Sequence, residues 1–414
     1  MAELKVEVDP AAVGFDAARL ARIDAHFARY VEDGRLPGWL ILVSRGGQIV
    51  HLGACGYRDL EARAPITWDT RFRIYSMTKP VTAVAAMMLY EEGAFELKDP
   101  VSRFIPAFAD TRVYRSGSTL KPVTEPLREP MRIWHLLTHT AGLTYGFHHT
   151  HPVDALYRAA GFEWSAPDGF NLAACCDAWA SLPLLFQPGT EWNYSIASDV
   201  LGRVVEVASG LRLDRFFAER IFQPLGMRDT GFSAPTDDGA RLAALYSPEP
   251  GTLRAVRNDA MARMTQHSAQ CCLGGEGLVS TVGDYHRFTQ MLRRGGELDG
   301  VRLLGSRTLR YMTRNHLPGG VDLESFGRPI FAETTFDGVG YGLGFSVTLN
   351  PVANKVLASP GEFAWGGVAS TAFWVDPTED ITALLFTQLF PSSTHTLRPQ
   401  FRQLVYQALV DEPG

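Results

Sequence analysis

The sequence predicts an α+β fold: an antiparallel sheet flanked by terminal helices, with an inserted helical domain. Apolar runs typical of strands gather at both ends of the chain, whereas the middle carries helical periodicity and long loops. The length of 414 residues exceeds that at which one hydrophobic core usually stops growing. We therefore expect a discontinuous sheet domain of residues 1–90 and 270–414, and a mostly helical domain of residues 91–269.

The N-terminal region predicts a helix and then a hairpin. Apolar residues at three- and four-residue steps predict an amphipathic helix within the first 35 residues, namely Leu20, Ile23, Phe27 and Tyr30. The segment Gly34–Gly38 ends this helix. Two apolar runs, residues 39–44 and 48–53, flank Arg45-Gly46-Gly47, and glycines in that place favour the turn of a β-hairpin.

The C-terminal region carries β-branched and aromatic runs bounded by Gly, Pro and Asp. They predict three or four successive antiparallel strands, in residues 341–348, 363–365, 371–375 and 381–389. A closing helix is expected over residues 397–409. The simplest assembly joins the N-terminal hairpin to these strands in one sheet, with the terminal helices packed on a face. A cleft between this sheet and the helical domain is a common place for a small-molecule site.

Composition limits the classes of function. The chain is 46% apolar and 20% charged, as in an average globular enzyme, which excludes a disordered protein. The 39 basic and 45 acidic side chains give a formal net charge of −6 without any Lys/Arg-rich run, so nucleic acid is not an expected partner. No apolar run approaches the about 18 residues that a membrane span needs. The start lacks the pattern of a secretory signal, and we expect a cytoplasmic protein.

The cysteines and histidines do not predict a metal site or a disulfide framework. The five cysteines are Cys55 and the adjacent pairs Cys175-Cys176 and Cys271-Cys272, and adjacent cysteines seldom bridge each other. We interpret them as small buried side chains. Loop histidines without a fixed spacing partner are expected to be solvated or to belong to a lid, namely His148, His149 and His151. No metal and no other cofactor is predicted.

The segment Ser76-Met77-Thr78-Lys79 indicates nucleophilic chemistry. A helix-forming stretch follows it, and Pro80 is tolerated only near a helix start, which places Ser76 in or just before the first turn. Backbone N–H groups there favour negative charge, and Lys79 falls on the same face. A serine hydroxyl beside an amine that takes its proton is an activated nucleophile. Because an amine in water is protonated at neutral pH, this role requires burial or neighbouring positive charge.

The Ser-x-x-Lys pattern is weak by itself, and only its context selects this copy. Ser118-Thr119-Leu120-Lys121 also matches, but it lies in a polar stretch without a following helix and is rejected. The first copy is followed, in chain order, by residues 134–143, Tyr194-Ser195-Ile196, residues 274–285 and Trp365-Gly366-Gly367-Val368.

Together these motifs resemble the serine β-lactamase/penicillin-binding superfamily of class C type, and most closely the family VIII carboxylesterases. The resemblance extends from about residue 15 to about residue 409, with the motifs in the expected order. It implies a serine β-lactamase-like fold, with Ser76 as the acylated nucleophile and Lys79 as its partner in proton transfer. Tyr194 would be the general base or the relay to the leaving group.

The resemblance also implies an oxyanion hole and a substrate-binding strand. The backbone N–H groups of Ser76 and Val368 would form the hole, and Trp365-Gly366-Gly367 stands where lactamases carry Lys-Thr-Gly. The two glycines would let a strand edge approach the substrate closely.

Two departures from the lactamase pattern favour a neutral ester as substrate. Ile196 replaces an Asn amide that contacts a β-lactam side chain, and Trp365 replaces a lysine that would attract a carboxylate. Without that lysine, either Tyr194 or Lys79 could be the base.

Further residues are assigned to the surroundings of the site. Tyr145 is expected to line the acyl pocket, and residues 145–187 are expected to form a lid that sets acyl size. Thr138, His139 and Asp199 are expected to bond loop backbone rather than substrate.

The predicted function is a serine carboxylesterase that hydrolyses small to medium acyl esters through an acyl-enzyme on Ser76. A first alternative is an acyltransferase that hands the acyl group to an alcohol, like the lovastatin-type enzymes that the chain also resembles. A second is a β-lactamase or D-alanyl carboxypeptidase, against which Trp365 argues. A third is an inactive homologue that only binds, against which the retention of Ser76, Lys79 and Tyr194 argues. The expected partner is a small ester, with neither nucleic acid nor membrane.

Overall fold

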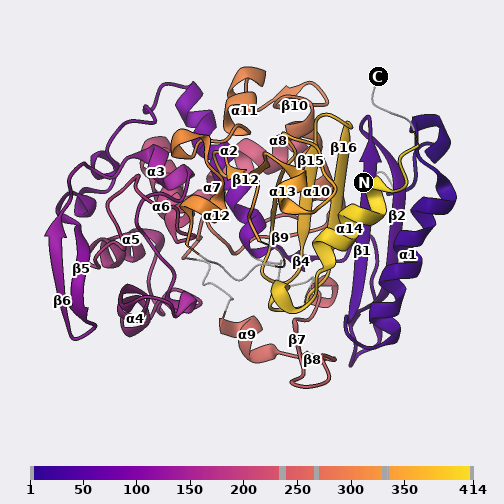
Figure 1. Cartoon of the computed structure of the whole chain (residues 1–414), viewed down its shortest axis with the longest axis horizontal. Coiled ribbons are helices and arrows are strands. Elements are labelled where there is room, and N and C mark those ends of the chain that lie inside the picture. The colour runs from indigo at the N-terminus through magenta and orange to yellow at the C-terminus, as the bar shows by residue number, and fades with distance from the viewer. Residues whose placement is uncertain (1–3, 233–238, 265–269, 329–332, 334, 411–414) are drawn as a thin grey trace.

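One antiparallel sheet joins the two ends of the chain (Figure 1). The computed structural model describes residues 4–232, 239–264, 270–328, 333 and 335–410. The strands of the sheet, in the order in which they lie, are β12 (Val339–Tyr341), β13 (Ser346–Thr348), β14 (Phe363–Gly366), β15 (Ala372–Asp376), β16 (Ile381–Phe386), β1 (Gly38–Arg45), β2 (Gln48–Asp59) and β3 (Ala64–Pro65). β16 pairs with β1, with Leu40 opposite Phe386. The predicted α+β fold class is confirmed.

The terminal helices cover one face of the sheet. They are α1 (Ala17–Glu32) and α14 (Leu397–Tyr406), indigo and yellow in the right half of Figure 1. The ring of Phe27 packs against Trp39 of β1 and Phe401 of α14, at centroid distances of 5.9 and 6.1 Å. Burial of one such side chain stabilises the fold by about 1.5–3 kcal/mol.

Helix α10 (Val282–Arg293) covers the opposite face, against β15, β16 and β1. Burial from both sides explains why every residue of β15 and β16 is buried and why these strands are mostly apolar instead of alternating.

The run predicted as one strand over residues 341–348 is two strands, which corrects the prediction. Its central glycines turn the chain, so that β12 and β13 pair as a hairpin. Gly344 has a φ of +90°, and a Cβ there would lie 2.4 Å from the Cβ of Ala83 in the neighbouring helix. Only glycine gives both this conformation and this close approach.

The part of the chain between residues 78 and 264 carries helices α2 to α9 separated by long loops, and it packs beside the sheet. Its helices include α2 (Thr78–Glu91), α3 (Ile133–Leu137), α4 (Pro152–Ala159), α5 (Leu172–Ala180), α6 (Ala197–Ser209), α7 (Leu213–Phe217), α8 (Gln223–Leu225) and α9 (Asp259–Met264). The short elements between α9 and β14 are β9 (Val279–Ser280), β10 (Glu297–Leu298), β11 (Val301–Arg302), α11 (Ser306–Met312), α12 (Leu323–Phe326) and α13 (Pro351–Asn354). Helices α2 and α6 pack against each other at the centre.

Two hairpins in the middle of the chain were not predicted. One joins β5 (Arg112–Ser118) to β6 (Lys121–Pro126) at the left edge of Figure 1, and the other joins β7 (Tyr246–Pro248) to β8 (Ala255–Arg257) at its lower edge. Most residues of β5 and β6 are exposed, so their sequence lacks the alternation of apolar and polar residues that marks a half-buried strand.

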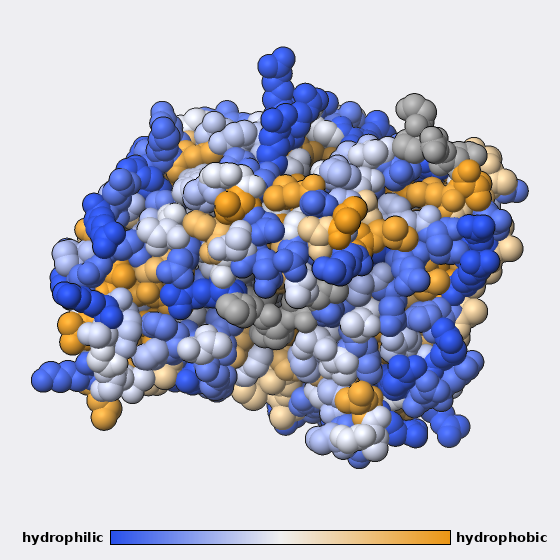
Figure 2. Space-filling model, viewed as in Figure 1, coloured by the Kyte–Doolittle hydropathy of each residue, from blue (hydrophilic) through white to orange (hydrophobic). Residues whose placement is uncertain are grey.

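The apolar core runs without a break from the sheet into the helices. One cluster of buried side chains includes Leu40 and Phe386 of the sheet together with Val153 and Trp179 of the helical region. The division at residues 90 and 269 therefore stays a prediction, and residue 269 itself lies outside the described residues. In the part of the chain that the structure describes, no helix has the length and apolarity needed to cross a bilayer. Figure 2 shows hydrophilic side chains over most of one face, with hydrophobic ones in scattered patches.

Candidate active site

Ser76 lies on the turn between a short strand and the central helix. Strand β4 (Phe72–Arg73) pairs with β9, the 3-10 turn Tyr75–Met77 follows, and α2 begins at Thr78. Tyr75 has a φ of +42°, a left-handed conformation that costs about 1–3 kcal/mol in a residue other than glycine. The turn leaves Ser76 partly exposed, while Met77 and Thr78 are buried. The serine is therefore presented at the N-terminal end of α2.

Lys79 lies directly beneath the serine. Its Nζ is 3.0 Å from Ser76 Oγ and donates a hydrogen bond of 2.8 Å to the carbonyl oxygen of Gly275. The side chain is buried, and its Nζ lies 4.6 Å from the centre of the Tyr194 ring and 5.5 Å from that of Tyr145. The spacing predicted from the first helical turn thus places the amine next to the hydroxyl.

Gly275, which supplies this acceptor carbonyl, is itself held through its N–H by a side chain of the helical region. Asp199, in the first turn of α6, accepts a hydrogen bond of 2.7 Å from the Gly275 N–H. A Cβ on Gly275 would lie 2.8 Å from this carboxylate, and one on Gly274 would lie 2.4 Å from the Ser198 carbonyl. Asp199 bonds loop backbone, as expected. The role of Gly275 was missed, although the Gly274-Gly275 pair was the available signal.

Tyr194 lies over Lys79 in an aromatic cluster. Its ring packs against His139, Tyr145 and Trp192, with centroids 5.1, 5.5 and 6.2 Å away. The indole N–H of Trp365 donates a long hydrogen bond of 3.4 Å to the Tyr194 hydroxyl. Trp365 was assigned from the sequence to the substrate-binding strand, in place of a lactamase lysine, and the structure adds this polar contact with the phenol.

The titratable side chains next to this cluster are held neutral. Burial, with a further contribution from Lys79, holds the pKa of His139 well below its ordinary value. Burial likewise raises the pKa of the Tyr145 phenol well above its ordinary value. At neutral pH His139 therefore adds no positive charge to this cluster, and Tyr145 adds no negative charge.

Two backbone N–H groups are available for an oxyanion. Within the described ranges, neither the Ser76 N–H nor the Val368 N–H donates to a protein acceptor, and both residues line the same cleft. The end of β14 packs tightly against the serine turn, because a Cβ on Gly367 would lie 2.5 Å from the Ile74 carbonyl oxygen. The structure thus gives Gly367 a role in packing the strand end against the serine turn, and the predicted approach of the two glycines to the substrate stays a prediction.

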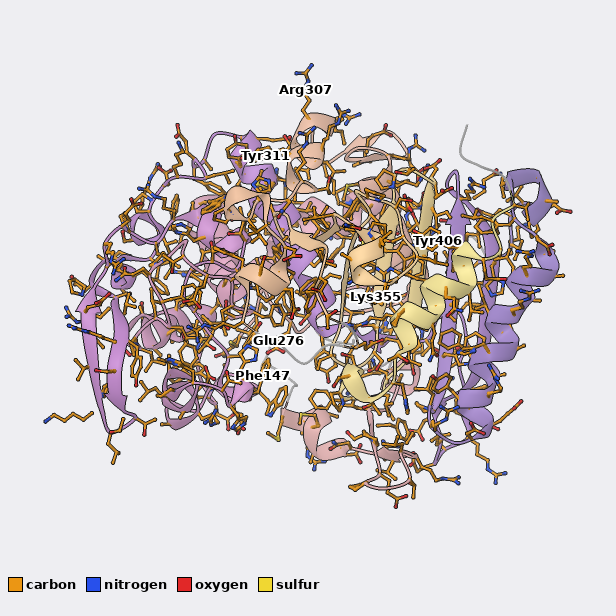
Figure 3. All side chains as sticks on the ribbon, viewed as in Figure 1. Phe147, Glu276, Arg307, Tyr311, Lys355 and Tyr406 are labelled. Carbon is orange, nitrogen blue, oxygen red and sulfur yellow. The ribbon has the colours of Figure 1, made fainter. Side chains whose placement is uncertain are left out.

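The cleft above Ser76 has a volume of about 180 Å³ and an aromatic wall. Tyr145, Phe147 and Trp164 stack in succession, with centroids 4.6 and 4.3 Å apart. Phe147 and Glu276, which both line the cleft, are labelled between the helical half and the sheet in Figure 3. All three stacked rings come from residues 145–187, the segment predicted as a lid, and Tyr145 lines the cleft.

Several residues named from the sequence lie away from the cleft. Ile196 does not line it: its side chain is buried, and α6 begins at the next residue. It is therefore not placed to bind substrate. The alternative motif lies on the β5–β6 hairpin, where the Lys121 N–H donates to Ser118 Oγ.

The three loop histidines each have a partner of their own. The ring of His148 lies 2.7 Å from the Tyr194 carbonyl, that of His149 lies 3.2 Å from Glu163, and that of His151 accepts from the Val153 N–H. Among the residues that the structure describes, no group of three or more His, Cys, Asp or Glu side chains is placed to hold a metal ion.

Comparison with known proteins assigns the family. A family model described as beta-lactamase matches residues 23–407. The chain belongs to the beta-lactamase family. The predicted resemblance is thereby confirmed.

Within this family, the chain is similar to ester-cleaving and acyl-transferring members. Esterase EstB of Burkholderia gladioli is 34% identical over 402 residues, which cover 92% of this chain and 93% of the esterase. The solved structure of EstCE1, described as a hydrolase with promiscuous acyltransferase activity, has a TM-score of 0.78 at 27% identity. The match covers 94% of this chain and 99% of the EstCE1 chain. The solved structure of a mutant of simvastatin synthase from Aspergillus terreus has a TM-score of 0.79 at 26% identity. The match covers 95% of this chain and 98% of the synthase.

Proposed function

We propose that this beta-lactamase family member is a serine carboxylesterase that works through an acyl-enzyme on Ser76. The observation that carries the proposal is the distance of 3.0 Å between Ser76 Oγ and Lys79 Nζ, at the bottom of a cleft that also presents two unbonded N–H groups. The likeness to EstB over nearly the whole chain supports an ester as the substrate.

In the acylation step, Ser76 Oγ attacks the ester carbonyl while its proton passes to a neighbouring base. Lys79 is the nearest base, because its Nζ lies 3.0 Å from Ser76 Oγ. The Tyr194 phenol, over the same amine, is the second group that can carry the proton. Proton transfer by a positioned side chain contributes about 10²–10⁴-fold to a rate.

The negative charge that develops on the carbonyl oxygen is received by the Ser76 and Val368 N–H groups. The alcohol then leaves with a proton delivered through Tyr194, and the ester carbonyl stays bonded to Ser76 Oγ. Water attacks this acyl-enzyme in the second half of the reaction, and its oxygen bonds to the acyl carbon. The bond to Ser76 Oγ breaks, the acid is released, and the proton that the water loses passes through the same base to Ser76 Oγ.

A neutral ester with an apolar group fits the cleft best. Trp365 stands where a lactamase lysine would attract a carboxylate, and the stacked rings of Tyr145, Phe147 and Trp164 offer an aromatic wall. Aromatic side chains bind apolar groups with little loss of conformational freedom. Small to medium acyl esters are therefore the proposed substrate class.

The first experiment measures hydrolysis of a p-nitrophenyl ester series and the intact mass of the protein after rapid quenching. Ser76→Ala is expected to abolish both turnover and the acyl adduct. Ser118→Ala, in the rejected Ser-x-x-Lys copy on the exposed hairpin, is the matched control and is expected to keep both. Unchanged turnover in Ser76→Ala refutes the proposal, and the lack of any adduct in the native protein refutes the acyl-enzyme.

Acyl transfer to an alcohol is the second candidate function, because EstCE1 is described as combining hydrolysis with acyl transfer. Product analysis with one ester and rising concentrations of a competing alcohol distinguishes hydrolysis, which gives the free acid, from acyl transfer, which gives a new ester. A nitrocefin assay tests the β-lactamase alternative, for which we expect at most weak turnover. The cytoplasmic location predicted from the sequence is tested by cell fractionation.

A further inference from the structure

Arg398 lies at the floor of the cleft, behind the strand that presents Val368. It is in the first turn of α14, and its Nη2 donates hydrogen bonds of 2.7 Å to the Gly367 carbonyl and 3.1 Å to the Thr371 carbonyl. The contact is close, because a Cβ on Gly366 would lie 2.6 Å from the guanidinium carbon. The helix therefore fixes the strand end through a charged side chain.

The bonded carbonyl belongs to the same peptide group as the proposed oxyanion donor. The Gly367 C=O and the Val368 N–H share one planar peptide, which is trans, so they point in opposite directions. A guanidinium that holds the oxygen on one side thus holds the N–H toward the other side. A charged donor on the oxygen also polarises the peptide and makes its N–H a stronger donor.

The guanidinium is itself held in place. The Glu333 carboxylate accepts from the Arg398 backbone N–H at 2.8 Å and lies 3.2 Å from its Nε. The side chain of Glu333 is 3% exposed and that of Arg398 is 24% exposed. Both Nη2 protons are taken by carbonyls and Nε faces a carboxylate, so this arginine is built to bond the protein.

We infer that Arg398 is a positioning residue that orients and polarises the Val368 N–H of the oxyanion hole. The inference rests on the proposed function, since it assigns a role in stabilising the oxyanion of the ester reaction. Arg398 would act through the peptide group and would not need to touch the substrate.

The test compares Arg398→Met, which keeps the volume but not the donors, with Arg398→Lys, which keeps the charge. Deletion of an oxyanion donor costs about 10²–10³-fold in kcat, and a donor that is only misoriented should cost about 10–100-fold. We expect Arg398→Met to lower kcat on a neutral ester by about 10–100-fold, with KM unchanged. The kcat of Arg398→Lys should lie between that of Arg398→Met and that of the native protein. The rate of inactivation by a phosphonate, which forms an anionic tetrahedral adduct, should fall in parallel with kcat.

Arg45→Met is the matched control for folding. Arg45 also donates to two backbone carbonyls, of Glu379 and Val13, and pairs with a glutamate, but it lies at the end of β1 and not at the cleft. Rates are expressed per active site titrated with the phosphonate, so a loss of folded protein does not count as a loss of kcat. Arg45→Met is expected to keep the native kcat per site.

Three outcomes overturn the inference while the proposed function stands. One is a native kcat per site in Arg398→Met. The second is a rise in KM confined to anionic esters, which would make Arg398 a substrate-binding residue. The third is an equal loss of kcat in Arg45→Met. By contrast, a native protein that hydrolyses no ester and forms no phosphonate adduct refutes the proposed function itself.

Discussion

The amine nitrogen of Lys79 lies 3.0 Å from the hydroxyl oxygen of Ser76 and donates at the same time to the Gly275 carbonyl. The second bond fixes the amine beside the serine, so the pair does not depend on substrate to form. The amine also lies 4.6 Å from the centre of the Tyr194 ring and 5.5 Å from that of Tyr145, so aromatic groups enclose the pair.

Lys79→Met is expected to lower kcat for ester hydrolysis by about 10²–10⁴-fold, the usual contribution of a positioned acid or base. Lys121→Met on the exposed hairpin is the control and should keep the native rate. The measurement is the steady-state kcat of the native protein and of both variants on one p-nitrophenyl ester. A loss of less than tenfold in Lys79→Met would assign the base role to Tyr194 alone.

Asp199→Ala should impair both stability and rate. It leaves the buried Gly275 N–H without its acceptor, which costs about 1–3 kcal/mol in the free energy of unfolding. The carbonyl that orients Lys79 is then less restrained, so kcat should fall as well. Asp199→Asn keeps an oxygen acceptor. Its free energy of unfolding, measured by urea denaturation, and its kcat should both be closer to the native values than those of Asp199→Ala. Equal losses in the two variants would contradict this account.

Trp365→Phe separates the ring of Trp365 from its N–H. The hydrogen bond to the Tyr194 hydroxyl is long, 3.4 Å, so its loss should cost no more than an ordinary hydrogen bond. That is about 0.5–1.5 kcal/mol, or roughly a two- to twelvefold fall in kcat. KM should change little because an aromatic ring remains. A rise in KM with an unchanged kcat would show that Trp365 serves only as a wall.

The parts of the site that local sequence determines could be predicted from the sequence. The pairing of Ser76 with Lys79 follows from three-residue spacing at a helix start, and it is independent of the rest of the fold. Tyr194 and Val368 come from distant segments and were found through motifs that resemble a family. Ile196 was misplaced because α6 begins immediately after it, and its side chain turns into the core.

The features of the fold and the site that could not be predicted from the sequence depend on backbone groups and on long-range packing. Gly275 is held through its N–H by Asp199, 76 residues away in the sequence, and no local side-chain pattern encodes this bond. The sequence analysis assigned no role to Arg398, since its bond to Gly367 exists only when α14 packs against the sheet. The division of residues 341–348 into two strands likewise depends on the close approach of Gly344 to α2.

Trp164→Ala should change selectivity for the acyl group. The Trp164 ring stacks on Phe147 at a centroid distance of 4.3 Å and an angle of 8°, and both line the cleft. Loss of one aromatic contact is worth about 0.5–1.5 kcal/mol, so KM for a benzoate or hexanoate ester should rise roughly two- to twelvefold. An acetate ester should be almost unaffected. Trp68→Ala, at an exposed tryptophan outside the cleft, is the control. Equal changes for acetate and benzoate esters would contradict an acyl-binding role.

The free energy of unfolding should fall as the pH drops from about 6.5 towards 4. Burial lowers the pKa of His286 to about 3 and that of His135 to about 4, so in this range the unfolded chain binds more protons than the folded one. Each histidine then contributes a slope of up to about 1.4 kcal/mol per pH unit. Asp284 opposes them, because burial raises its pKa to about 6 and its folded form takes up a proton first.

His286→Gln is the variant that tests this balance. The neutral ring accepts from the Gln290 amide at 3.0 Å and lies 3.0 Å from the Ser44 hydroxyl, contacts that a protonated ring cannot keep unchanged. Glutamine offers polar atoms without titrating, so urea denaturation of the variant between pH 4.5 and 7.5 should give a shallower dependence on pH than that of the native protein. The absolute stability of the variant is not the readout, because a small loss of packing shifts it equally at every pH. A slope identical to that of the native protein would mean that His286 does not take up its proton on unfolding.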